Sequence, residues 1–513
     1  MIVFYHNKSK ISEIVSTEAI DFSNDINRNV VAVLLDFAQK FKDEIIVWCH
    51  ESEKSNLNIT EIAQLFHHKK MLLSYNPETD YFDRRLGYIE DSPYIKINKE
   101  VRYASWQMSS RVGAVHASVL NACKNDLYAK DNFDYFLNSF ARRAMLFGLL
   151  CYSEPKLLLQ NKVSEFNNES SLQELFKFTK QHYKARWVFL LFFNLLLFEK
   201  KFSLLPFLSS LCYKRRKLDS KLLNQIPLES NKKIVEQGTI DVLIPTIGRK
   251  DYLFNVLNNL AAQTFLPKNV IVIEQNPDMN STSDLDFIQN KKWPFVIKQH
   301  FTHQTGACNA RNIGLLMIES EFTFMADDDI IFENDLLEIA MKTFQTIGNE
   351  VFLVACHLKE QTVIPQLPMQ FPVFGAGHAF VKSSCIKGLK FNMGFEFGFG
   401  EDADFGMQLR NKGFDILYIS TTTILHLKAP IGGFRTKPIL GWQHDEIQPK
   451  PSPTVMLYRL MYDTKEQIQN YKSMIFIKNL NSSFLKNPFK YIKTFRQKWN
   501  RSVYWATELK KRA

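Results

Sequence analysis

The feature that most constrains this chain is an apolar run that ends on three consecutive acids. Residues 322–329 read Phe-Thr-Phe-Met-Ala-Asp-Asp-Asp. The apolar part predicts a buried strand, and its end would place the acids at the carboxyl edge of a sheet, where open α/β folds bind ligands. A hard divalent cation, held by a carboxylate pair together with ligand phosphates, would explain three like charges in a row. A solvated acidic turn is the alternative.

A second acidic cluster follows about 75 positions later, within residues 398–414. Glycines open a loop there, and Glu401, Asp402 and Asp404 then fall in a first helical turn, where the helix macrodipole favours acids. Gly413 is expected to end this helix. Helix capping would account for one or two of the acids. It does not explain why they follow a metal-type cluster in one α/β pattern.

Five segments, in this order, resemble the motifs of family 2 glycosyltransferases with the GT-A fold. They are Ile240-Asp-Val-Leu-Ile-Pro-Thr-Ile-Gly-Arg249, Val270-Ile-Val-Ile-Glu274, Gly306-Ala-Cys-Asn-Ala-Arg-Asn-Ile-Gly314, Ala326-Asp-Asp-Asp329 and Gly400-Glu-Asp-Ala-Asp-Phe-Gly406. The fourth resembles the metal-binding DxD. The fifth is closest to the Glu-Asp motif of galactosyl- and N-acetylgalactosaminyltransferases, which carries the base of inverting members. The resemblance covers roughly 200 of the 513 residues, and Glu274 stands where the family more often has Asp.

The resemblance implies a site for a nucleotide sugar, a metal ion and an acceptor. Its donor-binding residues would be Pro245, Thr246, Arg249, Glu274, Arg311, Asn312, Asp327 and Asp328. Asp327 and Asp329 suit Mn²⁺ or Mg²⁺, because alternate residues at a strand end can point at the same ion. Asp402 suits the base, and in the resembling families a residue such as Glu401 hydrogen-bonds acceptor hydroxyls. His426, which closes a later predicted strand, is a third metal ligand, a diphosphate contact or a structural histidine.

Transfer of a sugar from a nucleotide diphosphate needs these residue types. A metal ion neutralises the leaving diphosphate as a Lewis acid, and a placed carboxylate base contributes roughly 10²–10⁴-fold to the rate. Residues 429–435 read as a glycine loop with a basic tip, in which Gly432 and Gly433 permit closure and Arg435 meets phosphate. An ordinary glycine turn is the alternative.

Length and composition set outer limits. A chain of 513 residues with 45% hydrophobic and 23% charged residues predicts two or three globular domains. Seven cysteines without CxxC spacing favour a reducing compartment. The first residues lack the features of a signal peptide, and no segment reaches the roughly 18–20 apolar residues of a membrane span. These observations predict a cytoplasmic protein.

The first third contains short echoes of the later segments. Gly113–Cys123 shares six of eleven positions with Gly375–Cys385. Residues 33–48 similarly resemble the expected helix and strand of 256–273, and residues 133–152 resemble the acidic helix and the strand after it. These matches predict a second, degenerate GT-A-like unit that lacks the Asp triplet and is non-catalytic, or else they are chance similarity of short strands.

Two segments have the character of membrane-surface elements. In residues 486–513 nine Lys or Arg stand against one acid, which gives +8 of the formal +11, and aromatics recur among them at near-helical spacing. This pattern favours contact with an anionic membrane surface over nucleic acid, for which no motif is present, while a helix packed on the enzyme is the alternative. Residues 187–198 and 202–213 are largely apolar, with Glu199-Lys-Lys201 between them and a basic run at 214–217 after them, so they form a buried helix or an interfacial contact.

Together these observations predict an α/β protein with four parts: a degenerate GT-A-like domain (1–180), a helical connector (181–236), a catalytic GT-A domain (237–437) and a helical basic extension (438–513). The expected activity is metal-dependent, inverting transfer of a hexose or N-acetylhexosamine from a UDP-sugar to a glycan or lipid-linked acceptor in surface polysaccharide synthesis. The expected location is cytoplasmic, peripheral on the cytoplasmic face of the membrane. A sugar nucleotidyltransferase and a non-enzymatic glycan-binding scaffold are the rival functions.

Overall fold

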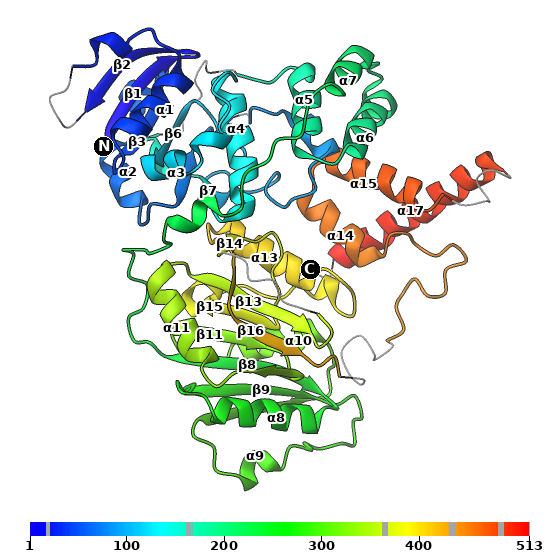
Figure 1. The fold of residues 1–513 in the computed structure, drawn as a ribbon. Helices are drawn as coiled ribbons and strands as arrows, with labels where there is room; N and C mark the ends of the chain where they lie inside the picture. The colour runs from blue at the N-terminus through cyan, green and yellow to red at the C-terminus, as the bar shows by residue number, and fades with distance from the viewer. Residues whose placement is uncertain are drawn as a thin grey trace. The chain divides into compact units, whose positions relative to one another are not determined.

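The computed structural model describes residues 1–16, 21–78, 80–160, 166, 168–361, 368–429, 438–480 and 487–511. The chain forms two compact units, each built on one sheet (Figure 1). Unit 1 comprises residues 1–232 and 464–474, and unit 2 comprises residues 233–463 and 475–513. Both sheets mix parallel and antiparallel strands and are accompanied by helices, so the predicted α/β class is confirmed.

Unit 1 has a seven-stranded sheet in the order β2-β1-β3-β6-β4-β7-β5. The strands are β1 (Ile2–Asn7), β2 (Lys10–Ser16), β3 (Ile45–His50), β4 (Met71–Ser74), β5 (Tyr103–Ala104), β6 (Val112–His116) and β7 (Leu150–Ser153). The helices are α1 (Val30–Lys40), α2 (Ile59–Leu65), α3 (Ala117–Ala122), α4 (Phe133–Ala144), α5 (Leu172–His182), α6 (Arg186–Asn194) and α7 (Leu204–Ser210). One hydrophobic core, which includes Trp48 and Phe140, joins this sheet to α1, α4, α5 and α6.

Unit 2 has a nine-stranded sheet in the order β10-β9-β8-β11-β15-β13-β16-β12, with β14 paired to β16. The strands are β8 (Ile240–Ile247), β9 (Asn269–Gln275), β10 (Val296–Thr302), β11 (Phe322–Ala326), β12 (Ile330–Phe332), β13 (Val351–Leu358), β14 (Met369–Gln370), β15 (His378–Lys382) and β16 (Leu417–His426). The helices are α8 (Lys250–Ala261), α9 (Phe287–Asn290), α10 (Ala307–Leu315), α11 (Leu336–Ile347), α12 (Ser383–Ile386), α13 (Glu401–Asn411), α14 (Pro453–Tyr462) and α17 (Pro488–Lys510). A further helix, α15 (Lys465–Lys478), contributes its first part to unit 1 and its end to unit 2.

The middle of the unit 2 sheet positions the acidic clusters. Strands β10, β9, β8 and β11 are parallel, and β8, β9 and β11 are nearly continuous runs of buried residues, as expected for strands covered on both faces. Strand β11 ends at Ala326, so the Asp triplet begins at its carboxyl edge, as predicted. Gly314 lets α10 approach β8 closely, because a Cβ atom there would lie 2.1 Å from Cδ1 of Leu243.

The two sheets share part of their topology. The matching strands are β3-β6-β4-β7 in unit 1 and β11-β15-β13-β16 in unit 2. In each set the second strand (β6 or β15) is antiparallel to both of its neighbours, and the last two strands are parallel to each other. Helix α3 follows β6 as α12 follows β15, and α4 precedes β7 as α13 precedes β16. These pairs agree with two of the three sequence echoes. The remaining echo, of residues 33–48 with 256–273, differs in detail, because β3 takes the sheet position of β11 rather than that of β9.

The basic C-terminal segment forms a helix packed on its own unit. In α17 the side chains of Trp499, Ala506 and Leu509 are buried, and the helix contacts α14. The ring of Phe495 lies 5.1 Å from the ring of Phe476 in α15, measured between centroids. Part of the aromatic face predicted for a membrane is therefore used in packing, while Phe489 at its start is 85% exposed. Among the described residues, no helix combines the length and hydrophobicity needed to span a bilayer.

We expect Asp241→Asn to lower the free energy of unfolding by about 2–3 kcal/mol. Asp241 is fully buried at the start of β8 and accepts four hydrogen bonds, from Asn269 Nδ2 (2.8 Å), the Glu319 and Ser320 amides (2.8 and 3.0 Å) and the Ser320 hydroxyl (2.6 Å). An amide would place N–H groups against these donors. Urea denaturation measures the change. The control Asp251→Asn, at an exposed position of α8, should change stability by less than about 0.5 kcal/mol. Equal effects of the two substitutions would contradict the assignment.

Candidate functional site

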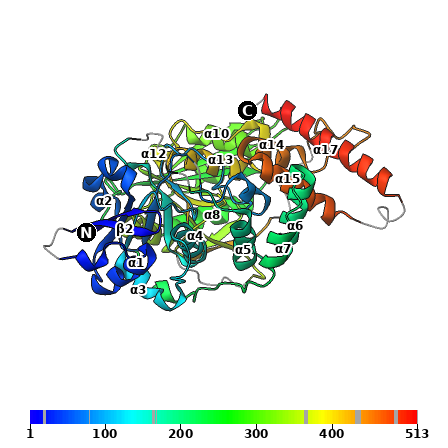
Figure 2. The ribbon, with the colours of Figure 1, turned by 90° about the horizontal axis from the view of Figure 1, so that it is seen from above.

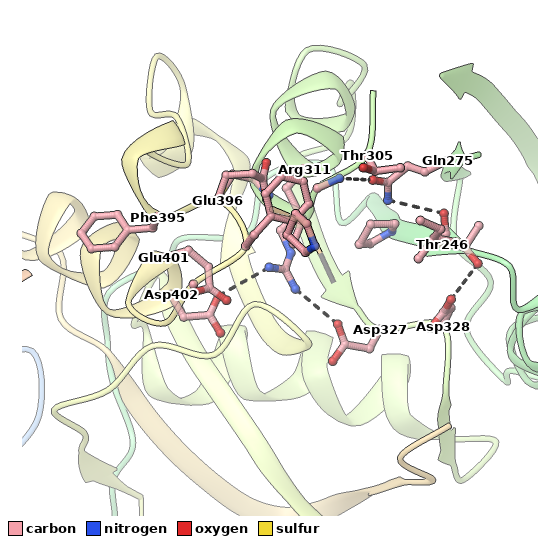
Figure 3. Close-up of a pocket in the computed structure, with 18 of the residues that line it drawn as sticks. Thr246, Gln275, Thr305, Arg311, Asp327, Asp328, Phe395, Glu396, Glu401 and Asp402 are labelled. Atoms are coloured by element: carbon pink, nitrogen blue, oxygen red, sulfur yellow. Dashed lines mark hydrogen bonds and ion pairs between the residues drawn. The ribbon is translucent and has the colours of Figure 1, made fainter. Parts of the chain in front are cut away.

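A cavity of about 660 Å³ opens where β8 and β11 end and α10 and α13 begin (Figure 3). This volume is in the range of small-molecule pockets. The structure brings ten of the twelve predicted site residues to its wall: Pro245, Thr246, Arg249, Arg311, Asp327, Asp328, Asp329, Glu401, Asp402 and His426. The sequence therefore identified most of one real cavity from segments that are far apart in the chain.

Three predicted metal ligands lie together in this cavity. Each of Asp327, Asp329 and His426 offers one ligand atom, and these atoms all lie within 4.8 Å of one another. His426 reaches the cluster because β16 pairs with β12, the short strand that follows the Asp triplet. Carboxylate oxygens and an imidazole nitrogen suit a divalent ion such as Mn²⁺, so the donor set fits the predicted cofactor.

Hydrogen bonds hold the cluster in place. His426 Nε2 lies 3.1 Å from Asp329 Oδ1, and the Ala429 amide donates to Asp329 Oδ2 at 2.7 Å. Burial alone would raise the pKa of Asp329, but these bonds outweigh it, and the pKa is lowered. The bond to Asp329 raises the pKa of His426. Asp329 is therefore a fixed, ionised carboxylate at the bottom of the site.

The middle acid of the triplet is turned away from this cluster. Asp328 is buried, accepts a hydrogen bond from the Thr246 hydroxyl at 2.7 Å, and pairs with Arg249 at 2.5 Å. Burial raises the pKa of Asp328 to about 6 against the opposing effect of Arg249. Asp328 thus fastens the loop after β8, the predicted nucleotide loop, to the end of β11.

Arg311 connects the metal cluster to the second acidic cluster. Its guanidinium lies 3.3 Å from Asp327 Oδ1 and 3.7 Å from Asp402 Oδ1, as Figure 3 shows. The side chain is buried and also lies over the ring of Phe391, with 5.3 Å between Cζ and the ring centroid. Arg311 is therefore a buried cation placed between one carboxylate of each acidic cluster.

The acid pair at the start of α13 has raised pKa values. Burial, followed by the charge of Asp402, raises the pKa of Glu401 to about 7. Burial also raises the pKa of Asp402, and Arg311 opposes this shift. Gly400 precedes the helix with a φ of 121°, a conformation that favours glycine. Asp404, the third acid, accepts bonds from Tyr462 and Gln408 and does not line the cavity.

Two predicted donor-binding residues do not line the cavity. Asn312 bonds the backbone of Phe391 through both ends of its amide, at 2.8 and 2.7 Å, so it positions the ring beneath Arg311. Glu274 accepts bonds from Ser283, from the Asp284 amide and from Gln299, and it joins β9 to a neighbouring loop.

Several lining residues were not predicted. Gln275, next to Glu274, accepts the Gly306 amide at 2.7 Å. Glu396 accepts the amides of Cys308 and Asn309 at the start of α10, at 3.2 and 2.8 Å. The only sequence signal for Glu396 was its place between phenylalanines and glycines just before the acidic helix. The predicted closing loop with Gly432, Gly433 and Arg435 lies outside the described residues.

In unit 1 the acids that follow β3 and begin α4 are paired with protein groups, unlike the cavity-lining acids that follow β11 and begin α13. Strand β3 ends at His50, and the acids that follow include Glu53, whose carboxylate pairs with the fully buried Arg111 at 2.7 Å. Asp134, the second residue of α4 as Asp402 is of α13, accepts bonds from the Ser110 amide and hydroxyl, both at 2.7 Å. Among the residues that the structure describes, the metal-type cluster of unit 2 is the one group of its kind.

Comparison with known families agrees with this geometry. Residues 241–395 match the family model for glycosyl transferase family 2. This part of the chain is therefore similar to that family. The match begins in β8 and ends just before the acidic helix α13, and the α/β architecture of the second unit is that of a GT-A domain.

Individual relatives are distant. The poly(ribitol-phosphate) β-N-acetylglucosaminyltransferase TarS of Staphylococcus aureus, from strains Mu50 and MW2, is 26% identical over 115 residues, which is 22% of this chain and 20% of TarS. The chain thus spans about a fifth of the length of these curated relatives. Among solved structures, TarS residues 1–349 with UDP-GlcNAc gives a TM-score of 0.35 at 19% identity, covering 45% of this chain and 69% of that one. The structure of GalNAc-T7 with UDP, GalNAc and Mn²⁺ gives a TM-score of 0.36 at 12% identity, covering 56% of this chain and 61% of that one. These scores are too low to bear on function.

We expect Glu401→Gln to flatten the pH dependence of stability above pH 5. With a folded pKa of about 7 and an ordinary value of 4.5, wild-type Glu401 holds a proton in the folded state that the unfolded chain has released. Its stabilising effect is complete below the unfolded pKa and is lost as pH rises through about 7. Wild-type stability should therefore fall between pH 5 and pH 8 by up to about 1.4 kcal/mol per unit more than that of the variant. Thermal melts across pH measure this, with Glu338→Gln, at a partly exposed position of α11, as the control. Identical slopes for Glu401→Gln and wild type would contradict the expectation.

Proposed function

We propose that unit 2 transfers a hexose or N-acetylhexosamine from a UDP-sugar to a hydroxyl of a glycan or lipid-linked saccharide, with inversion, in surface polysaccharide synthesis. The observation that supports it is a single cavity in which a metal-type cluster and a carboxylate pair with raised pKa values are joined by one buried arginine. The match of residues 241–395 to family 2 supports the reaction class. The similarity to TarS, a poly(ribitol-phosphate) β-N-acetylglucosaminyltransferase, supports an N-acetylhexosamine donor and a polymeric acceptor.

Two groups of lining residues would bind different parts of the donor. The loop after β8, with Thr246 and Arg249, would hold the nucleotide, and Arg249 offers its guanidinium to anionic oxygens. Asp327, Asp329 and His426 would hold the metal ion. When bound, such an ion supplies charge neutralisation for the leaving diphosphate.

Asp402 is the proposed base. Arg311 favours its ionised form, while Glu401, with a pKa of about 7, carries the proton of the pair in much of the population at neutral pH. A protonated Glu401 donates a hydrogen bond to the acceptor, and the charged Asp402 accepts the proton of the attacking hydroxyl. One displacement from the face opposite the leaving group inverts the anomeric centre.

The rivals explain less of this geometry. A nucleotidyltransferase would use a glycine-rich, basic phosphate loop, whereas the loop of residues 245–249 has one glycine. A glycan-binding scaffold has no need of a carboxylate pair with raised pKa values beside a metal-type cluster. Unit 1 is proposed to be non-catalytic, because internal bonds engage the acids at its corresponding positions.

We expect Asp329→Ala to abolish divalent-metal-dependent transfer and to leave the fold intact. Asp329 is the most fixed of the three proposed ligands, so its loss removes both a ligand and the partner of His426. UDP release from a panel of UDP-sugars, with and without Mn²⁺ or Mg²⁺, measures the effect, and circular dichroism checks the fold. Asp335→Ala, at an exposed position shortly after β12, is the matched control. Wild-type turnover by a folded Asp329→Ala protein would exclude this metal site.

We expect Asp402→Asn to keep donor binding but to reduce transfer by at least about 10²-fold, because an amide cannot take the acceptor proton. Donor binding is measured by calorimetry with UDP-sugar and Mn²⁺, and transfer by product formation. Asp404→Asn, two residues further along α13 and outside the cavity wall, should retain most of the activity. Transfer by Asp402→Asn within tenfold of wild type, or a product with retained anomeric configuration, would exclude the proposed mechanism.

A further inference from the structure

An apolar surface on unit 1 lies outside the glycosyltransferase domain. It is formed by α6, the π-helical turn after it (Leu195–Glu199) and α7, which lie beside α5 in Figures 1 and 2. We call it the hairpin surface. Nine large side chains, each 37–80% exposed, belong to it: Phe189, Phe193, Leu196, Leu197, Phe202, Leu204, Leu205, Leu208 and Leu211. Soluble proteins rarely expose apolar groups together in this way unless they bind something there.

The orientation of α7 makes the surface unusual. Its leucines point outward, with Leu205 80% and Leu208 49% exposed, while Ser203 and Ser210 at its ends are buried. A helix that packs on a protein core in water shows the opposite arrangement. The outward apolar face of α7 is therefore suited to a non-aqueous neighbour.

Aromatic contacts make the surface continuous across the two helices. Phe192 has ring centroids 5.9 Å from Phe193, 5.7 Å from Phe202 and 5.0 Å from Phe207. Phe189 lies 5.2 Å from Phe207 in the same way. These contacts join the outer faces of α6 and α7 into one patch.

The inner face of α6 fixes this patch to unit 1. Val188, Leu191 and Leu195 are fully buried in the core. Asn194, also buried, donates to Asn470 at 3.0 Å and accepts from Ser473 at 2.7 Å. The outward face is thus presented by a helix whose other side is anchored, so the exposed side chains are not simply a loosened core.

Positive charge surrounds the patch. Between Lys184 and Lys217 the sequence has eight Lys or Arg and one acid, Glu199. One of the eight, Arg216, is paired with Asp131, so seven remain to face a partner. The Glu199 carboxylate is paired with Arg84 at 3.3 Å and lies 3.8 Å from Lys201. A second copy of the same surface would bring these cations against one another without compensating acids, so the charge argues against self-association and for an anionic partner.

We propose that the hairpin surface docks on an anionic lipid bilayer, with its leucines and phenylalanines among the acyl chains and its cations at the headgroups. This inference does not depend on the proposed reaction. It also assigns the membrane contact to α6 and α7 rather than to α17, in which Trp499 is buried and Phe495 packs on Phe476 of α15.

The test uses the full chain and vesicles of phosphatidylcholine alone or mixed with phosphatidylglycerol, analysed by co-sedimentation. We expect binding to the mixed vesicles that weakens as ionic strength rises, because exposed charges are screened beyond about 8–10 Å. Leu197→Glu combined with Leu205→Glu should reduce binding at least about tenfold, since both side chains are more than half exposed and enter the bilayer. Lys214→Glu with Arg215→Glu should reduce binding to the mixed vesicles in particular. Leu316→Glu, at an 85% exposed position of unit 2, is the control and should bind as wild type does.

Three results would overturn the proposal. One is unchanged vesicle binding by Leu197→Glu with Leu205→Glu. Another is loss of binding only in the Lys490→Glu and Lys493→Glu double variant, which would assign the contact to α17. Point substitutions are used for α17 because deleting this helix would expose α14. The third is a wild-type protein that ignores vesicles but forms a dimer, seen by light scattering, that the Leu197→Glu and Leu205→Glu pair dissociates.

Discussion

The cavity of unit 2 depends on one buried cation. Arg311 lies between Asp327 of the metal-type cluster and Asp402 of the acid pair, and without it two groups of carboxylates would face each other across a partly dry space. Burial raises the pKa of Asp402, and the charge of Arg311 opposes that rise. Asn312 and Phe391 support the guanidinium from behind, so a residue that does not line the cavity still determines its electrostatics.

The two units share part of their topology but give their buried carboxylates different partners. In unit 2 the acids after β11 are held by hydrogen bonds on one side and face the cavity on the other. In unit 1 the fully buried Arg111 pairs directly with Glu53 and Glu78, and Asp134 is bonded to Ser110. A guanidinium that occupies the acids internally removes the requirement for a bound cation. The same strand and helix order therefore carries internally paired acids in one unit and acids that line a cavity in the other.

The sequence predicted the parts of the site that follow from strand ends and helix starts. The acids after β11 and at the start of α13 could be placed because an apolar run and a glycine-bounded helix fix their surroundings. Glu274 and Asn312 were assigned to the donor by motif alone, yet their side chains bond to neighbouring protein groups, a distinction that depends on side-chain direction. Glu396 could not be predicted, since its role comes from meeting the start of α10 across the fold. The echo of Gly113–Cys123 with Gly375–Cys385 was aligned out of register with the shared topology: His116 and Lys382 directly precede α3 and α12, whereas the sequence pairs His116 with His378, four positions earlier.

The apolar helices show that sequence periodicity alone cannot predict which helix face is covered by protein and which is exposed. Both α17 and the α6–α7 pair have an apolar face beside basic residues, and the sequence favoured the first as the membrane element. What separates them is the neighbour of each face. Trp499 and Leu509 of α17 are buried in their own unit, whereas α7 buries two serines and exposes its leucines. The sequence predicts that a helix has a hydrophobic face, but only the packing of the rest of the chain shows whether other residues of the protein already bury that face.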